Sequence, residues 1–210
     1  MEPAMGCSIV LRSALIGLCL AGSGCQAAPS PGGPAASDPV GPPRLFPAEL
    51  HTGFDGMAAF RVPAVVLDAR GPVTWSVSDP SVATLEVDGA EVMVVSKDTG
   101  TATLRAEVDG EILAAELYVA LYDAALAPLG VEIYAESCAS CHVAEDGPDH
   151  TPSEIGQHAD SVLATMIYAG LDPLGNEWPD HRWSLEGDAM RAMLRHIRQL
   201  EPRGMPSPGE

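Results

Sequence analysis

The chain has 210 residues, with 29 acidic and 11 basic side chains, so its formal charge is −18 at neutral pH. This balance argues against nucleic-acid binding, because a basic surface supplies most of the affinity of nucleic-acid-binding proteins. Hydrophobic residues make up 46% of the chain, which is enough for a folded core, while 19 Pro and 21 Gly indicate that part of the chain is linker.

Residues 1–24 are predicted to be an export signal. Their apolar run, residues 13–22, is too short to span a bilayer and matches the length of a signal-peptide core. The run ends in Gly-Ser-Gly before Cys25, which resembles a bacterial lipobox, in which the cysteine is lipidated and becomes the mature N-terminus. The resemblance implies export and a lipid anchor at Cys25 on a bacterial membrane, on the periplasmic or cell-surface side. Simple secretion with an unmodified Cys25 is the alternative.

Residues 25–43 are predicted to be an extended tether. About half of this segment is Pro or Gly, and it has no apolar periodicity. Such a chain cannot bury enough apolar surface to fold. About 18 residues at ~3.1 Å each would reach roughly 50 Å from the anchor to the first folded residue.

Residues 44–121 are predicted to form an all-β domain. Val, Thr and Ala alternate with polar residues at period 2, and Asp-Pro, Asp-Gly and Thr-Gly turn signals separate the runs. The expected strands are residues 60–67, 73–77, 82–87, 91–95, 101–106 and 111–119. Pro63 suits an edge strand, and Trp75 is the expected aromatic of the core. Short strands at this spacing predict a small antiparallel sandwich.

The same region resembles a known family. The sequences VTWSVSDPSVATL at 73–85 and GTATLRA at 100–106 are similar to the bacterial immunoglobulin-like (Ig-like) domain of group 2. The resemblance implies an Ig-like sandwich that serves as a surface spacer or adhesive module, with no catalytic site.

The chemistry of the chain is expected at Cys138-Ala-Ser-Cys141-His142, the C-x-x-C-H spacing of c-type haem attachment. Two thiols one helical turn apart can bond the two vinyl groups of the porphyrin, and the adjacent His142 can ligate the iron. A thioredoxin-like pair, a structural zinc site and a disulfide are the alternatives. A thioredoxin-like pair requires a preceding strand. A zinc site requires a further ligand pair, for which no cysteine remains once Cys7 and Cys19 are assigned to the export signal and Cys25 to the lipid anchor.

Helical patterns flank the motif. Residues 130–142, 161–169 and 185–200 are expected to be helical, and the last has Met190, Met193, Leu194 and Ile197 on one apolar face and Arg191, Arg195 and Arg198 on the other. Residues 128–202 therefore resemble a class I, single-haem cytochrome c domain. The resemblance implies two domains, an all-β Ig-like sandwich followed by an all-α cytochrome c fold. It also implies one covalent haem c on Cys138 and Cys141, with His142 as the proximal iron ligand.

The sixth iron ligand is open. Trp178 stands where the family usually has a methionine, so His181 is a candidate for a second axial histidine, and five-coordinate iron, Met166 or water are the alternatives. Arg182 and Trp183 are candidates for contacts with the haem propionates. His150 and His158 are interpreted as polar loop residues.

The expected function is single-electron transfer by a membrane-anchored c-type cytochrome, which is not an enzyme. Its acidity predicts redox protein partners with a basic docking face. A haem peroxidase or small-gas sensor with an open sixth position is one alternative, and an adhesive or structural surface lipoprotein is another.

Overall fold

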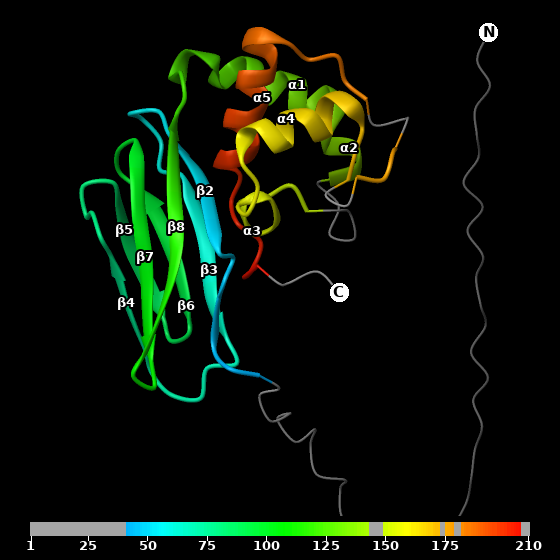
Figure 1. The fold of residues 1–210 in the computed structure, drawn as a ribbon. Helices are drawn as coiled ribbons and strands as arrows, with labels where there is room; N and C mark the ends of the chain where they lie inside the picture. The colour runs from blue at the N-terminus through cyan, green and yellow to red at the C-terminus, as the bar shows by residue number, and fades with distance from the viewer. Residues whose placement is uncertain (1–40, 143–148, 173–174, 179–181, 207–210) are drawn as a thin grey trace, which may run out of the picture. The chain divides into compact units, whose positions relative to one another are not determined.

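Residues 41–142, 149–172, 175–178 and 182–206 are described by the computed structural model of the chain, and their contacts place them in a single unit. Figure 1 shows that strands form the first part of this unit and helices the second. The predicted export signal, the lipidation site Cys25, nearly all of the tether and the candidate ligand His181 lie outside the described residues.

Residues 44–121 form two four-stranded sheets, which confirms the Ig-like β-sandwich. The strands are β1 (Arg44–Phe46), β2 (Glu49–Phe54), β3 (Arg61–Leu67), β4 (Val73–Val77), β5 (Ala83–Asp88), β6 (Glu91–Ser96), β7 (Gly100–Val108) and β8 (Glu111–Leu121). The sheets have the orders β1-β3-β6-β5 and β2-β8-β7-β4. The predicted antiparallel pairing holds for every pair except β2 with β8, which run parallel.

The alternation that predicts these strands also builds their core. In β7, Ala102, Leu104, Ala106 and Val108 are buried and face the opposite sheet, while the residues between them point outward. β3 is not the edge strand that Pro63 suggested, because it lies between β1 and β6. However, β1 pairs only with residues 65–67, so Pro63 lacks a partner on that side and its missing N–H disrupts no ladder.

Trp75 contributes to the core less than expected. Its ring is half-buried against the apolar cluster, and its indole N–H donates to the carbonyl of Gly89 at 3.1 Å. The fully buried side chains of the sandwich core are instead aliphatic, such as Leu50, Leu104 and Leu117.

The helical part begins directly after β8. It comprises a 3₁₀ turn at Ala124–Leu126 and the helices α1 (Ala127–Ser137), α2 (Ala139–His142), α3 (Pro152–Ile155), α4 (Asp160–Ala169) and α5 (Gly187–Gln199). Gly170 ends α4 in the left-handed conformation at φ 65°, as glycine commonly does after a helix. Among the described residues, no helix combines the length and the apolar character needed to cross a membrane.

The prediction of a separate all-α cytochrome c domain is wrong. The helical part is small, and α2 and α3 have four residues each. Its buried cluster includes Phe60 and Tyr122 from the sandwich together with Tyr134 and Met193 from α1 and α5. The helices therefore share a core with the sandwich, because two single-turn helices and three short ones do not enclose enough apolar surface alone.

Two arginines of α5 also differ from their predicted exposed positions. Arg195 forms a buried ion pair with Asp55, which follows β2, and Arg198 is fully buried. These side chains face the sandwich, and only Arg191 of the three lies exposed, paired with Asp188.

Candidate functional site

The C-x-x-C-H segment forms one tight helical bend between α1 and α2. The N–H of Cys138 donates to the carbonyl of Tyr134 at 2.9 Å, which closes the last turn of α1. The N–H groups of Cys141 and His142 both donate to the carbonyl of Cys138 at 3.1 Å. Because the backbone turns so tightly, two cysteines three positions apart lie within one turn of each other.

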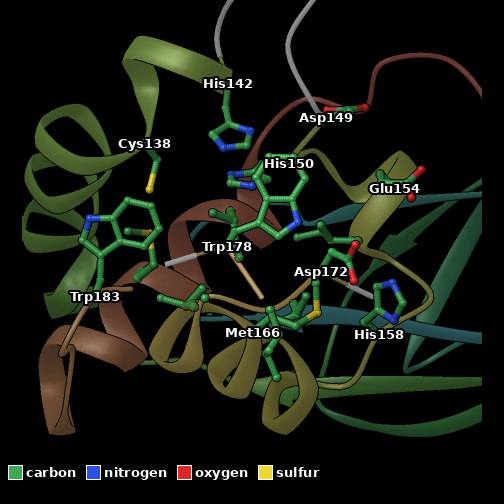
Figure 2. Close-up of a pocket in the computed structure, with 17 residues that line it drawn as sticks. Cys138, His142, Asp149, His150, Glu154, His158, Met166, Asp172, Trp178 and Trp183 are labelled. Atoms are coloured by element: carbon green, nitrogen blue, oxygen red, sulfur yellow. The ribbon is translucent and has the colours of Figure 1, made fainter. Parts of the chain in front are cut away.

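Cys138 and His142 line a cavity of about 420 Å³ between the helices (Figure 2). Helices α3, α4 and α5 supply most of its apolar wall, namely Ile155, Leu163, Met166, Ile167, Met193 and Ile197. His150 and His158 also line it, and so do Trp178 and Trp183. The cavity is therefore mostly apolar, with a few polar groups that could orient a ligand, as in typical small-molecule sites.

The structure brings some predicted site residues together and separates others. Cys138 and His142 are buried at the cavity, whereas Cys141 is exposed and does not line it. Trp183 lines the cavity, but Arg182 is exposed and donates to Glu177 at 3.0 Å.

His150 is a site residue that the sequence did not reveal. Its ring stacks on that of His142, with centroids 3.4 Å apart and planes 18° from parallel, and Tyr134 meets His150 edge-on at 6.3 Å. The nitrogen lone pairs of an imidazole lie in the plane of its ring, so stacking on its face does not cover them. The sequence between the two histidines includes Gly147-Pro148, which interrupts a regular helix or strand, so the sequence carried no signal that the two rings meet.

Burial governs the titration of the site. Burial, together with the neighbouring Cys141, raises the pKa of the Cys138 thiol to about 11. Burial and then the charge of Asp149 raise the pKa of Glu154 above its ordinary value. Because the thiolate is the reactive form of cysteine, Cys138 stays protonated and unreactive toward oxidants at neutral pH.

Cys138 and His142 fit the covalent haem that the motif implies, whereas Cys141 lies outside the cavity. A thiol and an imidazole from one helical bend reach the same apolar cavity, and its volume is within the roughly 300–1,000 Å³ range of small-molecule sites. In the part of the chain that the structure describes, no three His, Cys, Asp or Glu side chains are grouped so as to hold a metal ion by themselves.

Comparisons with known proteins give matches among solved structures alone. No family model matches the chain, and no curated protein matches it. The chain is similar to the Ig-like domain (714–804) of human obscurin-like protein 1, at 13% identity over 41% of this chain and 93% of that chain, with a TM-score of 0.28. It is also similar to a mutant form of the complex between titin M10 and the obscurin-like 1 Ig domain, at 19% identity over 40% of this chain and 95% of that chain, with a TM-score of 0.32.

A third similar structure is the twitchin kinase region from C. elegans, at 13% identity and a TM-score of 0.32. The match covers 38% of this chain and spans only 16% of that chain. The order of strands and helices itself corrects the resemblances to the group 2 Ig-like family and to class I cytochrome c to a coarser description. The chain is an Ig-like β-sandwich followed by a small helical part.

Proposed function

We propose that the helical part binds one haem c covalently and that the chain transfers single electrons between redox partners. The observation that carries this proposal is the convergence of Cys138 and His142 on one apolar cavity. The proposal concerns the attached group and not the family, since the helical part lacks the all-α cytochrome c fold.

In this proposal Cys138 and Cys141 hold the porphyrin through thioether bonds, and His142 ligates the iron. When bound, the haem supplies an iron that takes up and releases one electron. The chain's own contribution is to exclude water with the apolar side chains of α4 and α5, because burial is one of the properties that set the potential of a haem. The stacked ring of His150 fixes the plane of His142.

The experiment is production of the full chain in a bacterial host that attaches haem c, followed by haem staining on a denaturing gel and by intact mass. We expect haem that survives denaturation in the wild type and is absent from the Cys138→Ala/Cys141→Ala double variant. Ser140→Ala changes an exposed residue inside the same motif and should keep the haem. A wild-type chain without covalent haem contradicts the proposal.

We further propose that acylation of Cys25 anchors the chain to a membrane. Cys25→Ser should then move the protein from the membrane fraction to the soluble fraction, and the mass of the mature chain should lose its acyl groups. Cys19→Ser is the matched control, because Cys19 follows Leu18 and not a run of small residues. A membrane-bound Cys25→Ser variant contradicts the anchor.

The net charge of −18 supports partners that present a basic docking face. Electron-transfer rates with such a partner should fall as ionic strength rises, since salt screens exposed charges. A stopped-flow rate that does not change between low and high salt contradicts this choice of partner.

A further inference from the structure

One polar atom of the cavity has no partner in the described structure. The Nε2 atom of His158 is buried and makes no hydrogen bond, although the residue lines the cavity. A buried polar atom without a hydrogen-bond partner is destabilising, because it has lost its bonds to water and gained none in the protein. Such an atom beside a ligand cavity therefore points to a group that it binds.

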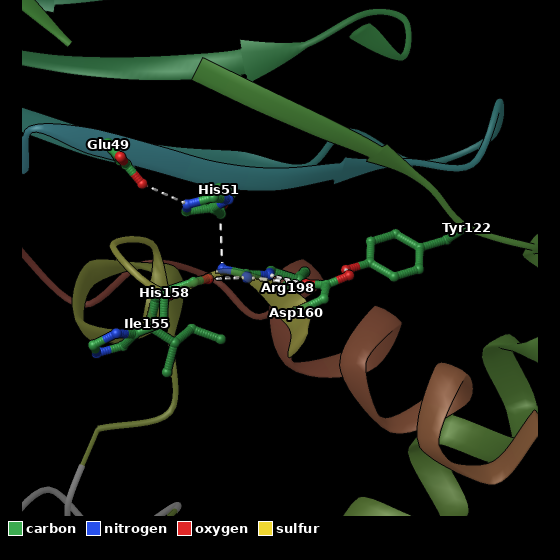
Figure 3. A network of polar contacts seen from close by, with 7 residues as sticks. All are labelled: Glu49, His51, Tyr122, Ile155, His158, Asp160 and Arg198. Atoms are coloured by element: carbon green, nitrogen blue, oxygen red, sulfur yellow. Dashed lines mark hydrogen bonds and ion pairs between the residues drawn. The ribbon is translucent and has the colours of Figure 1, made fainter. Parts of the chain in front are cut away.

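The position of His158 is fixed by the core. The backbone N–H of His158 donates to the carbonyl of Ile155 at 3.0 Å, and its backbone carbonyl accepts from the guanidinium of Arg198 (Figure 3). Arg198 is held in turn by Asp160, at 3.1 Å from Nε and 3.0 Å from Nη2, and by the carbonyl of His51 at 2.9 Å. The side chain of His158 thus extends from a backbone that buried hydrogen bonds immobilise.

The surroundings of this imidazole also disfavour its protonated form. Burial, and then the positive charges of Arg198 and His51, lower the pKa of His158 below its ordinary value. A neutral imidazole nitrogen is the form that ligates metals.

Other side chains that could ligate a haem iron line the same cavity. Figure 2 shows His142 at its upper side and Met166 and His158 at its lower side. His150 is stacked on His142 itself, so it lies with the first ligand and not across from it. The lower side therefore offers the imidazole of His158 and the thioether of Met166. The Nε2 atom of that imidazole is buried and makes no hydrogen bond.

Resting on the proposed function, we propose that the Nε2 atom of His158 is the second axial ligand of the haem iron, which makes a bis-histidine pair with His142. Coordination would satisfy the nitrogen that the folded chain leaves without a partner. Six-coordinate iron has no open position, which favours electron transfer over the binding of peroxide or a gas. Two histidines should also give a lower potential than histidine with methionine, since methionine ligation raises it.

The test is the visible and EPR spectrum of the full chain with haem attached. We expect a low-spin ferric spectrum in the wild type and a high-spin one in His158→Ala. His158→Met should remain six-coordinate and show a raised reduction potential. Met166→Leu and His181→Ala, which remove the competing ligands, should keep the wild-type spectrum.

Haem staining of every variant separates the two proposals. If the wild type carries no covalent haem, the proposed function fails and this inference fails with it. If haem is attached but the wild type is high-spin, or His158→Ala stays low-spin, only the ligand assignment is overturned. Loss of the low-spin spectrum in Met166→Leu or His181→Ala, with His158→Ala unchanged, assigns the position to that residue instead.

Discussion

The sandwich and the helical part are stabilised in different ways. The sandwich closes its own core with aliphatic side chains from both sheets, such as Leu50, Leu104 and Leu117. The helical part completes its core with two aromatic rings of the sandwich and places two arginines in the interface. An aliphatic core needs only the right pattern along each strand, whereas a shared core with buried charges needs specific partners from elsewhere in the chain. The helical part should therefore depend on the sandwich, and the reverse dependence should be weaker.

The largest expected effect comes from separating the two regions. Residues 41–122 should retain a β-type circular dichroism spectrum and unfold cooperatively with urea. Residues 123–206, studied without haem, should show no cooperative transition, because they lose Phe60, Tyr122 and the carbonyl of His51. A haem-free helical fragment that unfolds cooperatively would show that this region is independent.

Replacement of Arg198 should be the most damaging single substitution. Its guanidinium donates to the carbonyls of His51 and Ile155 at 2.9 Å and pairs with Asp160, and it is fully buried. Arg198→Leu removes these hydrogen bonds and leaves the Asp160 carboxylate without its buried ion-pair partner, so we expect the free energy of unfolding to fall by about 3–5 kcal/mol. Urea denaturation of the wild type and the variant measures this difference in the free energy of unfolding.

Arg191→Leu is the matched control for Arg198→Leu. It removes an exposed pair with Asp188 on the same helix and should change stability by about 0.5 kcal/mol or less. Equal losses in the two variants would mean that the buried network does not join the regions.

Gly130→Ala should have an intermediate effect. Gly130 lies where α1 crosses α5, and a Cβ atom there would overlap the carbonyl oxygen of Ala192 and approach the Cβ of His196 to 3.0 Å. Since a backbone oxygen cannot move aside easily, we expect a loss of about 1–3 kcal/mol in urea denaturation. Gly41→Ala, whose Cβ would meet only the Asp68 carboxylate at 3.7 Å, should stay within about 0.5 kcal/mol.

The smallest expected effect is the pH dependence contributed by His51. Burial and then Arg198 lower the pKa of His51, while Glu49 opposes them. Because the unfolded histidine binds a proton more readily, its contribution to stability is present above about pH 6.5 and is lost as the pH falls toward the folded-state pKa.

Two variants test this contribution in opposite directions. His51→Gln should flatten the dependence of unfolding free energy on pH between about 5 and 7. Glu49→Gln should steepen it, because it removes a group that raises the pKa of His51. His196 also has a lowered pKa, but its causes do not include His51, so its contribution cancels in the comparison. The charge of His51 helps to lower the pKa of His158, so His51→Gln should weaken that shift as well and flatten the dependence further. Parallel curves for all three would contradict the assignment.

Prediction from sequence succeeded where a residue's role follows from its near neighbours in the chain. The alternation at 101–106 predicted β7, and the helical pattern at 161–169 predicted α4. The tight spacing of Cys138 and His142 likewise predicted two side chains within one helical turn. In each case the physical cause, a two-residue repeat or one turn of helix, acts over a few residues.

Prediction from sequence failed for side chains whose hydrogen-bond partners are distant in the chain. Arg195 and Arg198 have the spacing of an exposed helical face, yet Asp55 and the carbonyl of His51 receive them in the interior. Helical periodicity separates apolar from polar positions, but it does not show which polar side chains another element will hydrogen-bond. His158 lies in the turn between α3 and α4, as a loop residue should, but the sequence did not show that its Nε2 is buried.

The sequence by itself determined the β-strands, the main helices and the placement of Cys138 and His142 within one helical turn, because local periodicity and spacing fix these features. The tertiary structure decided that the helices form no separate domain and that β2 runs parallel to β8. It also decided that His150 stacks on His142 and that the Nε2 of His158 is buried beside the cavity. These features depend on which surfaces meet when the chain folds, and the free energy of that packing is not contained in any single segment.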